Sequence, residues 1–264
     1  AGKPCDVIAT KPGPMKAIVA VGKKILVASA DKTVRIWDLT PTWDLYKKIG
    51  GLQDSKTLVD RVNSLSYSPD GKLLASGGGV PSRSGELKVW NVAEGKLVCS
   101  NTESHSDTIS GISFSPDGAF IATAATDRFV KVFNMEGAVL ERSFEGHTNH
   151  VLDVAWRADG FVLASGGADQ VVKEWDFEKG SQKQTVKGHT KGVSSIAYMG
   201  IGEQLISSSG DQSVRIANKP LPDAATFIHS SSVSKDGTII AAGGEDSILR
   251  IWTTGDSKLY LKLQ

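Results

Sequence analysis

One pattern recurs along the chain, and it constrains the fold more than any other feature of the sequence. An Asp-Gly pair followed by a short apolar run occurs at Asp70-Gly71, Asp117-Gly118, Asp159-Gly160 and Asp236-Gly237. Asp70 and Asp117 are 47 positions apart, and Asp117 and Asp159 are 42 positions apart. Such a period matches one four-stranded antiparallel unit, in which Asp-Gly supplies a turn between two strands.

A second series of segments runs in phase with these turns. Each is a β-rich segment, and most have an aromatic residue at the last or next-to-last position. They occupy Val34–Asp38, Leu87–Asn91, Val130–Asn134, Val171–Asp176, Val214–Ala217 and Ile248–Trp252. Strands this short cannot bury an apolar face alone, whereas radial packing of small sheets buries both faces of each sheet. The sequence therefore predicts an all-β propeller with six recognisable four-stranded blades, over residues 15–53, 58–103, 106–146, 148–188, 190–225 and 226–264.

Together with Gly146-His147 and Gly188-His189, these segments resemble the WD40 repeat family, which is named for its Trp-Asp dipeptide. The resemblance implies a WD40 β-propeller over residues 15–264, preceded by an N-terminal arm or closing strand over residues 1–14. Two architectures stay open: a six-bladed ring with an overhanging arm, or part of a larger ring such as one that closes with seven blades. The two prolines of residues 218–223 cannot donate to a strand ladder, so we expect the outer strand of blade five to be missing or displaced.

The resemblance also implies a buried hydrogen-bonded chain inside a blade, formed by a His, a Ser or Thr, an Asp and a Trp. Blade four has the complete set as His147, Ser165, Asp169 and Trp175. Blades three and five keep the first three members, and blades one and six keep only the Asp and the Trp. We expect the blades that lack the His to depend more on apolar packing.

Three features invite a catalytic or ligand-binding interpretation, and for each we favour a structural one. His147, Ser165 and Asp169 have the residue types of a catalytic triad, but they occupy positions where the WD40 family uses them for folding. His147 and His150 lack further ligands for a metal, and Gly77–Gly85 lacks the spacing of a phosphate-binding loop. We expect Gly77–Gly85 to be a long loop that projects from one rim. The sequence thus predicts no catalytic residue, no metal site and no cofactor.

Composition narrows the classes of partner. The chain has 30 Lys+Arg against 29 Asp+Glu, so it lacks the positive excess that general nucleic-acid or membrane-surface binding requires. Its two cysteines, Cys5 and Cys99, are 94 positions apart and cannot form a disulfide scaffold or a haem-attachment motif, although a single bridge between them stays open. No window approaches the roughly 18 apolar residues of a membrane-spanning helix. We therefore predict no nucleic-acid partner and no membrane insertion.

Within the family, residues 59–65, 79–87 and 150–160 are similar to bacterial WD40 proteins of the planctomycete type. In that group the propeller is often fused to, or partnered with, a c-type cytochrome domain and is exported. The resemblance therefore implies a c-type cytochrome domain as an alternative partner, and it favours a periplasmic or other extracytoplasmic compartment over the cytoplasm. The chain begins at Ala1 without a Met or a leader, which predicts a processed chain or a piece of a longer one.

These observations favour a non-catalytic scaffold that binds other proteins through a rim of loops. The loops that enter each blade and the turns between its second and third strands share one rim, which nominates as partner-binding residues Arg61, Arg83, Asp107, Arg128, His150, Gln170, Lys191 and Gln212. The first alternative is the propeller module of an exported redox protein that docks a c-type cytochrome. A second alternative is an enzyme or small-ligand binder that uses the central channel, and it requires convergent polar groups with perturbed pKa values there.

Overall fold

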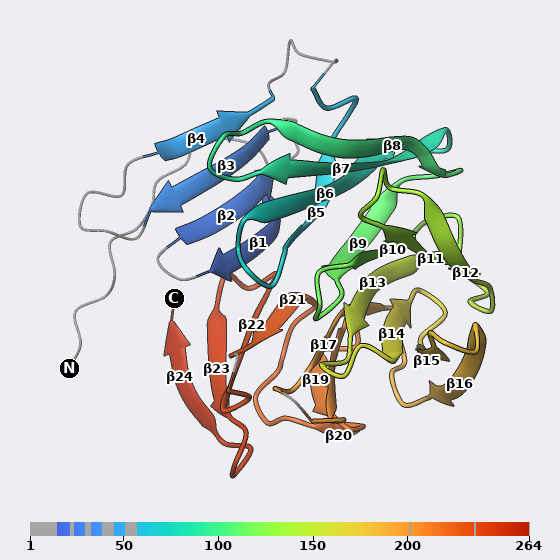
Figure 1. Cartoon of the computed structure of the whole chain (residues 1–264). Helices are drawn as coiled ribbons and strands as arrows, with labels where there is room; N and C mark the ends of the chain where they lie inside the picture. The colour runs from blue at the N-terminus through green and yellow to red at the C-terminus, as the bar shows by residue number, and fades with distance from the viewer. Residues whose placement is uncertain are drawn as a thin grey trace.

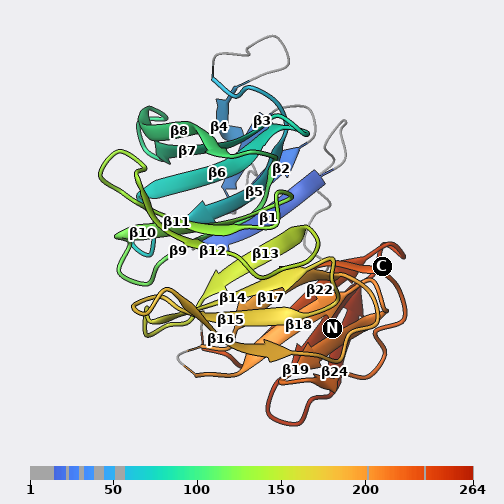
Figure 2. The ribbon, with the colours of Figure 1, turned by 90° about the vertical axis from the view of Figure 1, so that its right-hand side faces the viewer.

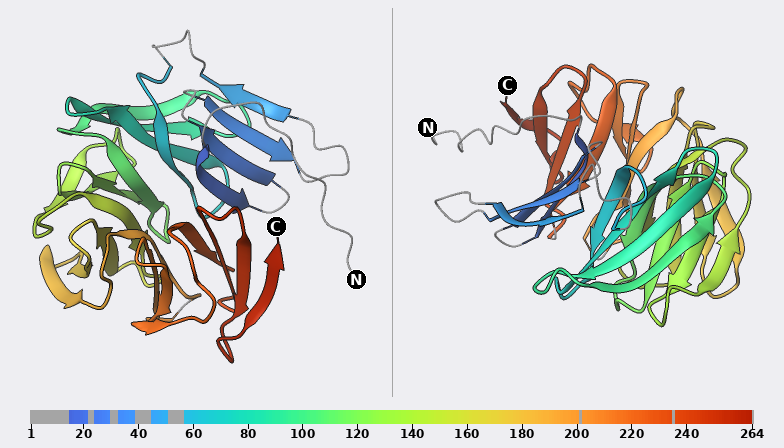
Figure 3. Two further views of the ribbon diagram at one scale, coloured as in Figure 1. Left: turned by 180° about the vertical axis from the view of Figure 1, so that it is seen from behind. Right: turned by 90° about the horizontal axis from the view of Figure 1, so that it is seen from above.

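Every regular element in the described part of the chain is a β-strand, and the strands form six four-stranded antiparallel sheets (Figure 1). The computed structural model describes residues 15–21, 24–29, 33–38, 45–50, 57–200, 202–234 and 236–263. Within these ranges, no helix has the length and apolar character needed to cross a membrane. The sheets, called blades one to six in chain order, follow one another around a central axis, and the first strand of each blade lies innermost (Figures 1 and 3).

The strands follow the repeat that the sequence predicts, with four strands in each blade. Blades one to three contain β1 (Met15–Val21), β2 (Lys24–Ser29), β3 (Thr33–Asp38), β4 (Leu45–Ile49), β5 (Val62–Tyr67), β6 (Leu73–Val80), β7 (Ser84–Asn91), β8 (Leu97–His105), β9 (Ile109–Phe114), β10 (Phe120–Ala125), β11 (Val130–Asn134) and β12 (Leu140–Phe144). Blades four to six contain β13 (Val151–Trp156), β14 (Val162–Gly167), β15 (Val172–Asp176), β16 (Ser181–Val186), β17 (Val193–Tyr198), β18 (Leu205–Ser209), β19 (Ser213–Ile216), β20 (Lys219–Pro220), β21 (Ile228–Val233), β22 (Ile239–Gly244), β23 (Leu249–Thr253) and β24 (Leu259–Leu263).

The Asp-Gly turns join the first strand of a blade to the second, and the turn between β5 and β6 shows how they work. The Ser68 hydroxyl donates to Asp70 Oδ1 at 2.7 Å and accepts the N–H of Leu73 at 2.9 Å. Gly71 has a φ of 71°, a left-handed conformation that a residue with a Cβ rarely adopts. The repeated Ser-Pro-Asp-Gly sequence therefore encodes the turn itself.

Adjacent blades are joined by apolar side chains that pack against small residues of the preceding blade. At Gly77 of β6, a Cβ would lie 2.6 Å from Ile109 Cγ2 of blade three, and at Gly166 of β14 it would lie 2.8 Å from Val193 Cγ1 of blade five. The inner strands of consecutive blades consequently lie side by side around the ring, as β9 and β13 do in Figure 2.

The face of blade six that is turned toward blade one is more open than the corresponding faces of blades four and five. Leu249 is 40% exposed there, whereas Val172 and Val214, at the same register position of blades four and five, are 2% and 0% exposed. A Cβ added at Gly243 of β22 would meet no atom of the described residues within 4 Å. Consecutive inner strands from β1 to β21 contact one another extensively. The described strands of blades six and one form no contacts of that extent with each other. The described part of the ring is therefore least tightly packed where its last and first blades meet.

Two expectations about loops need correction. Gly77–Gly85 is not a long loop, because β6 and β7 continue through it, with Gly79 opposite Gly85 and Val80 opposite Ser84, so that only residues 81–83 form the turn. Glycine pairs allow this close strand approach. The outer strand of blade five is present as β20 but contains only Lys219–Pro220, because Pro220 has no N–H to extend the ladder.

Some expectations concern residues 1–14 and Cys5, which lie outside the described residues. Cys99 is a free, half-buried cysteine.

Candidate functional site

The antiparallel strand order places two kinds of loop at one end of every blade, here called the upper rim. They are the loops that lead from one blade into the next and the turns between second and third strands. Hydrogen bonds join the two kinds: the N–H of Ala168 donates to the carbonyl of His150 at 2.8 Å, and the N–H of Ser82 donates to Asp107 Oδ1 at 2.7 Å. The turns at the opposite ends of the strands form the lower rim.

The eight residues nominated from the sequence all lie in these upper-rim loops. Asp107 is half-buried, and although burial alone would raise its pKa, hydrogen bonds from the amides of Ser82 and Thr108 hold the pKa below its ordinary value. The other seven are exposed: Arg61, Arg83, Arg128, His150, Gln170, Lys191 and Gln212.

The turns between second and third strands hold their exposed residues in a fixed conformation. Arg128, Gln170 and Gln212 each follow an Asp and have φ values of 76°, 70° and 68°. The preceding Asp fixes this geometry in blade three, where Asp127 Oδ1 accepts the N–H of Phe129 at 3.1 Å. These side chains therefore project from rigid turns.

The cations of the two rims differ in their partners. Arg61, Arg83, Arg128 and Lys191 make no ion pair or side-chain hydrogen bond within the described part of the chain. By contrast, each cation in the described lower-rim turns pairs with a carboxylate: Lys72 with Asp70, Lys96 with Glu94, Arg157 with Asp159, Lys179 with Asp176, and Lys258 with Asp256. The upper rim thus presents four cations without ion pairs, and the exposed carboxylates Glu145 and Glu245 of the same rim form no ion pair among the described residues either.

Beneath the upper rim, blade four contains a continuous hydrogen-bonded chain. His147 Nδ1 lies 2.9 Å from Asp169 Oδ2, His147 Nε2 lies 2.7 Å from Ser165 Oγ, and Trp175 Nε1 donates to Ser165 Oγ at 2.8 Å. Blades three and five have shorter versions, with His105 between Asp127 and Thr123 and His189 between Asp211 and Ser207.

The protonation of these groups follows from their burial. Desolvation lowers the pKa of His147, as it does for His105 and His189, so the imidazole is neutral near pH 7. Its Nδ1–H then donates to Asp169, and its Nε2 accepts the Ser165 hydroxyl. Ser165 is 0% exposed, so no substrate can reach this hydroxyl from solution. The geometry fits a relay that fixes the blade and does not fit a nucleophile in an open pocket.

Blades two and six contain polar groups that the sequence reasoning missed. In blade two, Lys88 Nζ pairs with Glu86 Oε1 at 2.6 Å and donates to the carbonyl of Thr57, while Trp90 Nε1 donates to Ser76 Oγ. In blade six, the buried Arg250 pairs with Asp246 and donates to the carbonyl of Asp223 at 2.8 Å. Blade six therefore has a buried donor, Arg250, in addition to the apolar packing around Trp252, and its greater dependence on that packing stays a prediction.

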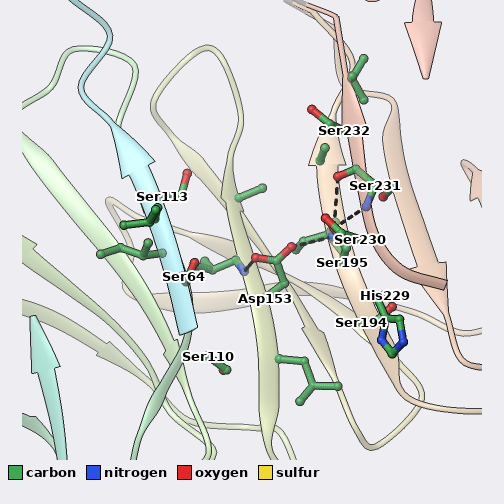
Figure 4. Close-up of a pocket in the computed structure, with 18 of the residues that line it drawn as sticks. Ser64, Ser110, Ser113, Asp153, Ser194, Ser195, His229, Ser230, Ser231 and Ser232 are labelled. Carbon is green, nitrogen blue, oxygen red and sulfur yellow. Dashed lines mark hydrogen bonds between the residues drawn. The ribbon is translucent and has the colours of Figure 1, made fainter. Parts of the chain in front are cut away.

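The central channel contains a cavity of about 360 Å³ lined mainly by polar residues of the inner strands (Figure 4). Several of these residues join neighbouring blades: Asn63 Nδ2 donates to the carbonyl of Ile109 at 2.9 Å, and the Ser194 hydroxyl donates to the carbonyl of Ile228. Asp153 accepts the N–H of Ile196 at 2.9 Å, and desolvation raises its pKa to about 6. Burial also raises the pKa of Tyr198, which lines the same cavity and donates to Glu174 Oε1 at 3.2 Å. Both groups with a perturbed pKa are thus engaged between blades four and five.

The described histidines and carboxylates do not form a metal site. His147 uses both ring nitrogens within blade four, and His150 is an exposed rim residue. Across the described ranges, no three His, Cys, Asp or Glu side chains gather closely enough to hold a metal ion.

Comparison with known proteins agrees with this architecture. Four segments, residues 7–38, 138–176, 180–218 and 222–253, match the family model described as "WD domain, G-beta repeat", and together they cover more than half of the chain. The chain belongs to the WD40 repeat family. Residues 29–147 of this WD40 chain also match the model of "Eukaryotic translation initiation factor eIF2A".

Solved structures show the same fold at low sequence identity. "Structure of U3-55K" matches 97% of this chain and 84% of that chain, with 21% identity and a TM-score of 0.81. "Crystal structure of RRP9 WD40 repeats" matches 97% of this chain and 82% of that chain, with 21% identity and a TM-score of 0.83. At this identity the likeness establishes the propeller fold alone.

The similar curated proteins are eukaryotic, and the matches do not show the bacterial subgroup suggested by the sequence. The WD repeat-containing protein 26 homolog of Drosophila melanogaster is 38% identical over 34% of this chain and 14% of its own length. The Periodic tryptophan protein 2 homolog of Schizosaccharomyces pombe is 34% identical over 36% of this chain and 10% of its own length. Small ribosomal subunit protein RACK1y of rice is 28% identical over 49% of this chain and 32% of its own length. The chain therefore spans less than a third of each of these relatives.

Proposed function

We propose that this WD40 propeller is a non-catalytic scaffold that binds other proteins through its upper rim. The observation that carries the proposal is the set of free cations, Arg61, Arg83, Arg128 and Lys191, on turns fixed by the blades. An exposed side chain on a rigid scaffold loses little conformational freedom on binding, which favours recognition. The partner surface that fits these residues is acidic.

The interior of the propeller supports a scaffold more than an enzyme. The Ser-His-Asp groups of blade four are buried in a relay, and the channel residues join neighbouring blades. WD40 propellers in general bind other proteins and are generally non-catalytic. Side chains available for recognition therefore lie mainly on the rims.

The alternative of an exported redox module with a c-type cytochrome partner gains no support from the comparisons. None of the similar proteins reported above is described as a cytochrome or as the partner of one.

A charge-matched pair of variants tests the scaffold proposal. The first carries Arg61→Glu, Arg83→Glu, Arg128→Glu and Lys191→Glu on the upper rim, and the second carries Lys72→Glu, Lys96→Glu, Lys179→Glu and Lys258→Glu on the lower rim. Both change the net charge equally, so a partner recognised by the upper rim should be lost from the first variant and kept by the second in quantitative cross-linking mass spectrometry. Equal recovery of every cross-linked protein with both variants would contradict the proposal.

A further inference from the structure

A groove of about 500 Å³ lies on the lower rim between blades three and four, away from the upper-rim residues. It is bordered by the turn between β9 and β10, the turn between β13 and β14, and the start of the turn that follows β15. Its volume lies within the range of about 300–1,000 Å³ that is usual for ligand sites. The groove therefore has room for two or three side chains of a bound segment.

Three phenylalanine rings give this groove an apolar, aromatic lining. Phe161 is 53% exposed, which is unusual for a large apolar side chain. Phe120 and Phe177 are half-buried and meet edge to face, with their ring centroids 5.1 Å apart. Phe177 also packs edge to face on the buried Trp156, at 5.1 Å, so these rings are held in place before any ligand arrives.

Carboxylates border the aromatic lining, and two of them form no ion pair among the described residues. Glu178 is exposed, and the neighbouring cation Lys179, which interacts with it electrostatically, forms its ion pair with Asp176. Asp117 Oδ1 accepts the Ser115 hydroxyl and the N–H of Ala119, which hold the pKa of Asp117 below its ordinary value, so the carboxylate stays charged. The third, Asp159, pairs with Arg157, the cation of the same turn. The groove therefore presents uncompensated negative charge beside exposed aromatic rings.

We infer that this groove binds an arginine-bearing segment of a partner protein. A guanidinium is planar and stays charged, so it stacks on an aromatic face while donating hydrogen bonds to a carboxylate at its edge. Phe161 offers the face, and Asp117 and Glu178 offer the acceptors. The same carboxylates repel phosphate groups, so the charge of the groove favours a basic protein segment over RNA or an anionic membrane.

The test uses the whole chain and a fluorescein-labelled nine-residue peptide of alternating Arg and Gly, measured by fluorescence anisotropy. Phe161→Ser removes the stacking face, and Glu178→Lys reverses one free carboxylate. We expect each to weaken binding about five- to tenfold, a change in the range measured for cation–π contacts and charge-assisted hydrogen bonds. Phe161→Tyr keeps an aromatic ring and should bind within about twofold of the unmodified chain by the same reasoning.

Glu136→Lys is the matched control, because Glu136 is an exposed carboxylate in the corresponding turn of blade three but does not line the groove. It changes the net charge as much as Glu178→Lys and should leave binding nearly unchanged. A peptide with citrulline in place of arginine should not bind. Circular dichroism and urea midpoints like those of the unmodified chain show that each variant is folded.

Three results would overturn the inference. The first is an Arg-Gly peptide that does not bind the unmodified chain at millimolar concentration. The second is equal weakening by Glu136→Lys and Glu178→Lys, which would indicate a diffuse charge effect. The third is unchanged binding by Phe161→Ser.

Discussion

The relay of blade four allows a quantitative prediction about how this propeller is stabilised. Ser165 Oγ lies between two buried groups, because it donates to His147 Nε2 and accepts the N–H of Trp175. Ser165→Ala therefore leaves two buried polar groups without partners. Ser207→Ala in blade five leaves only one, since the strand register places Ala217 where blade four has its Trp.

The size of the effect follows from the number of groups left unpaired. A buried donor or acceptor without a partner costs about 1–3 kcal/mol. Ser165→Ala should therefore lower the free energy of unfolding by about 2–5 kcal/mol, and Ser207→Ala by about 1–3 kcal/mol. In a Trp175→Phe background, Ser165→Ala leaves only His147 Nε2 unpaired, so its cost should fall by about 1–2 kcal/mol.

Urea unfolding, followed by circular dichroism and by tryptophan fluorescence, measures these differences as shifts in midpoint at constant slope. Coincidence of the two signals establishes that a single transition is being compared. The reasoning is refuted if Ser165→Ala and Ser207→Ala cost the same, or if the cost of Ser165→Ala does not change in the Trp175→Phe background.

Three further predictions concern pH, blade packing and blade six. Burial holds the pKa of His105, His147 and His189 below the ordinary value of 6.5. The unfolded chain therefore takes up protons first, and urea midpoints should fall as the pH drops below 6.5. The raised pKa of Asp153 acts in the opposite direction but involves only one group, so a midpoint that rises would contradict the prediction. Gly166→Ala should destabilise the chain by about 1–3 kcal/mol because its Cβ would overlap Val193. Gly243→Ala should be neutral or slightly stabilising because its Cβ meets no atom of the described residues within 4 Å, and equal thermal midpoints for the two variants would count against the packing argument. Arg250→Lys should lower the free energy of unfolding by about 2–4 kcal/mol in urea titrations, since an ammonium cannot replace the forked contacts of the guanidinium to a carboxylate and a backbone carbonyl. A cost below about 0.5 kcal/mol would show that those contacts do not stabilise the blade.

The repeat made much of the fold predictable, because each blade encodes its own turns and strands locally. Ser68-Pro69-Asp70-Gly71 specifies a turn whose hydrogen bonds lie within six residues. The roles of His147, Ser165, Asp169 and Trp175 could be assigned in advance because the resemblance to the WD40 family implies which of them meet. Gly77–Gly85 was misjudged because glycine-rich sequence is typical of loops, and only the pairing of Gly79 with Gly85 shows that it is strand.

Buried ion pairs within a blade and contacts between blades could not be predicted in the same way. The pairing of Lys88 with Glu86 depends on both side chains facing one side of β7, and that of Arg250 with Asp246 depends on the turn geometry of blade six. The lower-rim groove is harder still, because Phe120 and Phe177 belong to different blades and meet only after radial packing. Exposure of Phe161 is likewise a property of the assembled ring and not of its local sequence.

The distribution of polar groups explains why recognition by this propeller should concentrate on its two rims. Inside the ring, Asn63, Ser194 and Asp153 hold neighbouring inner strands together, so replacing them should affect stability before it affects binding. At the rims, the turns are already fixed by backbone and Asp side-chain hydrogen bonds, which leaves their remaining charged residues free. On the upper rim, the free charges among the described residues include the cations Arg61, Arg83, Arg128 and Lys191 together with the carboxylates Glu145 and Glu245, whereas the free charges around the lower-rim groove are carboxylates. Because the two sites lie on opposite ends of the strands and have opposite charge, an acidic and a basic partner can bind one ring without competing for the same residues.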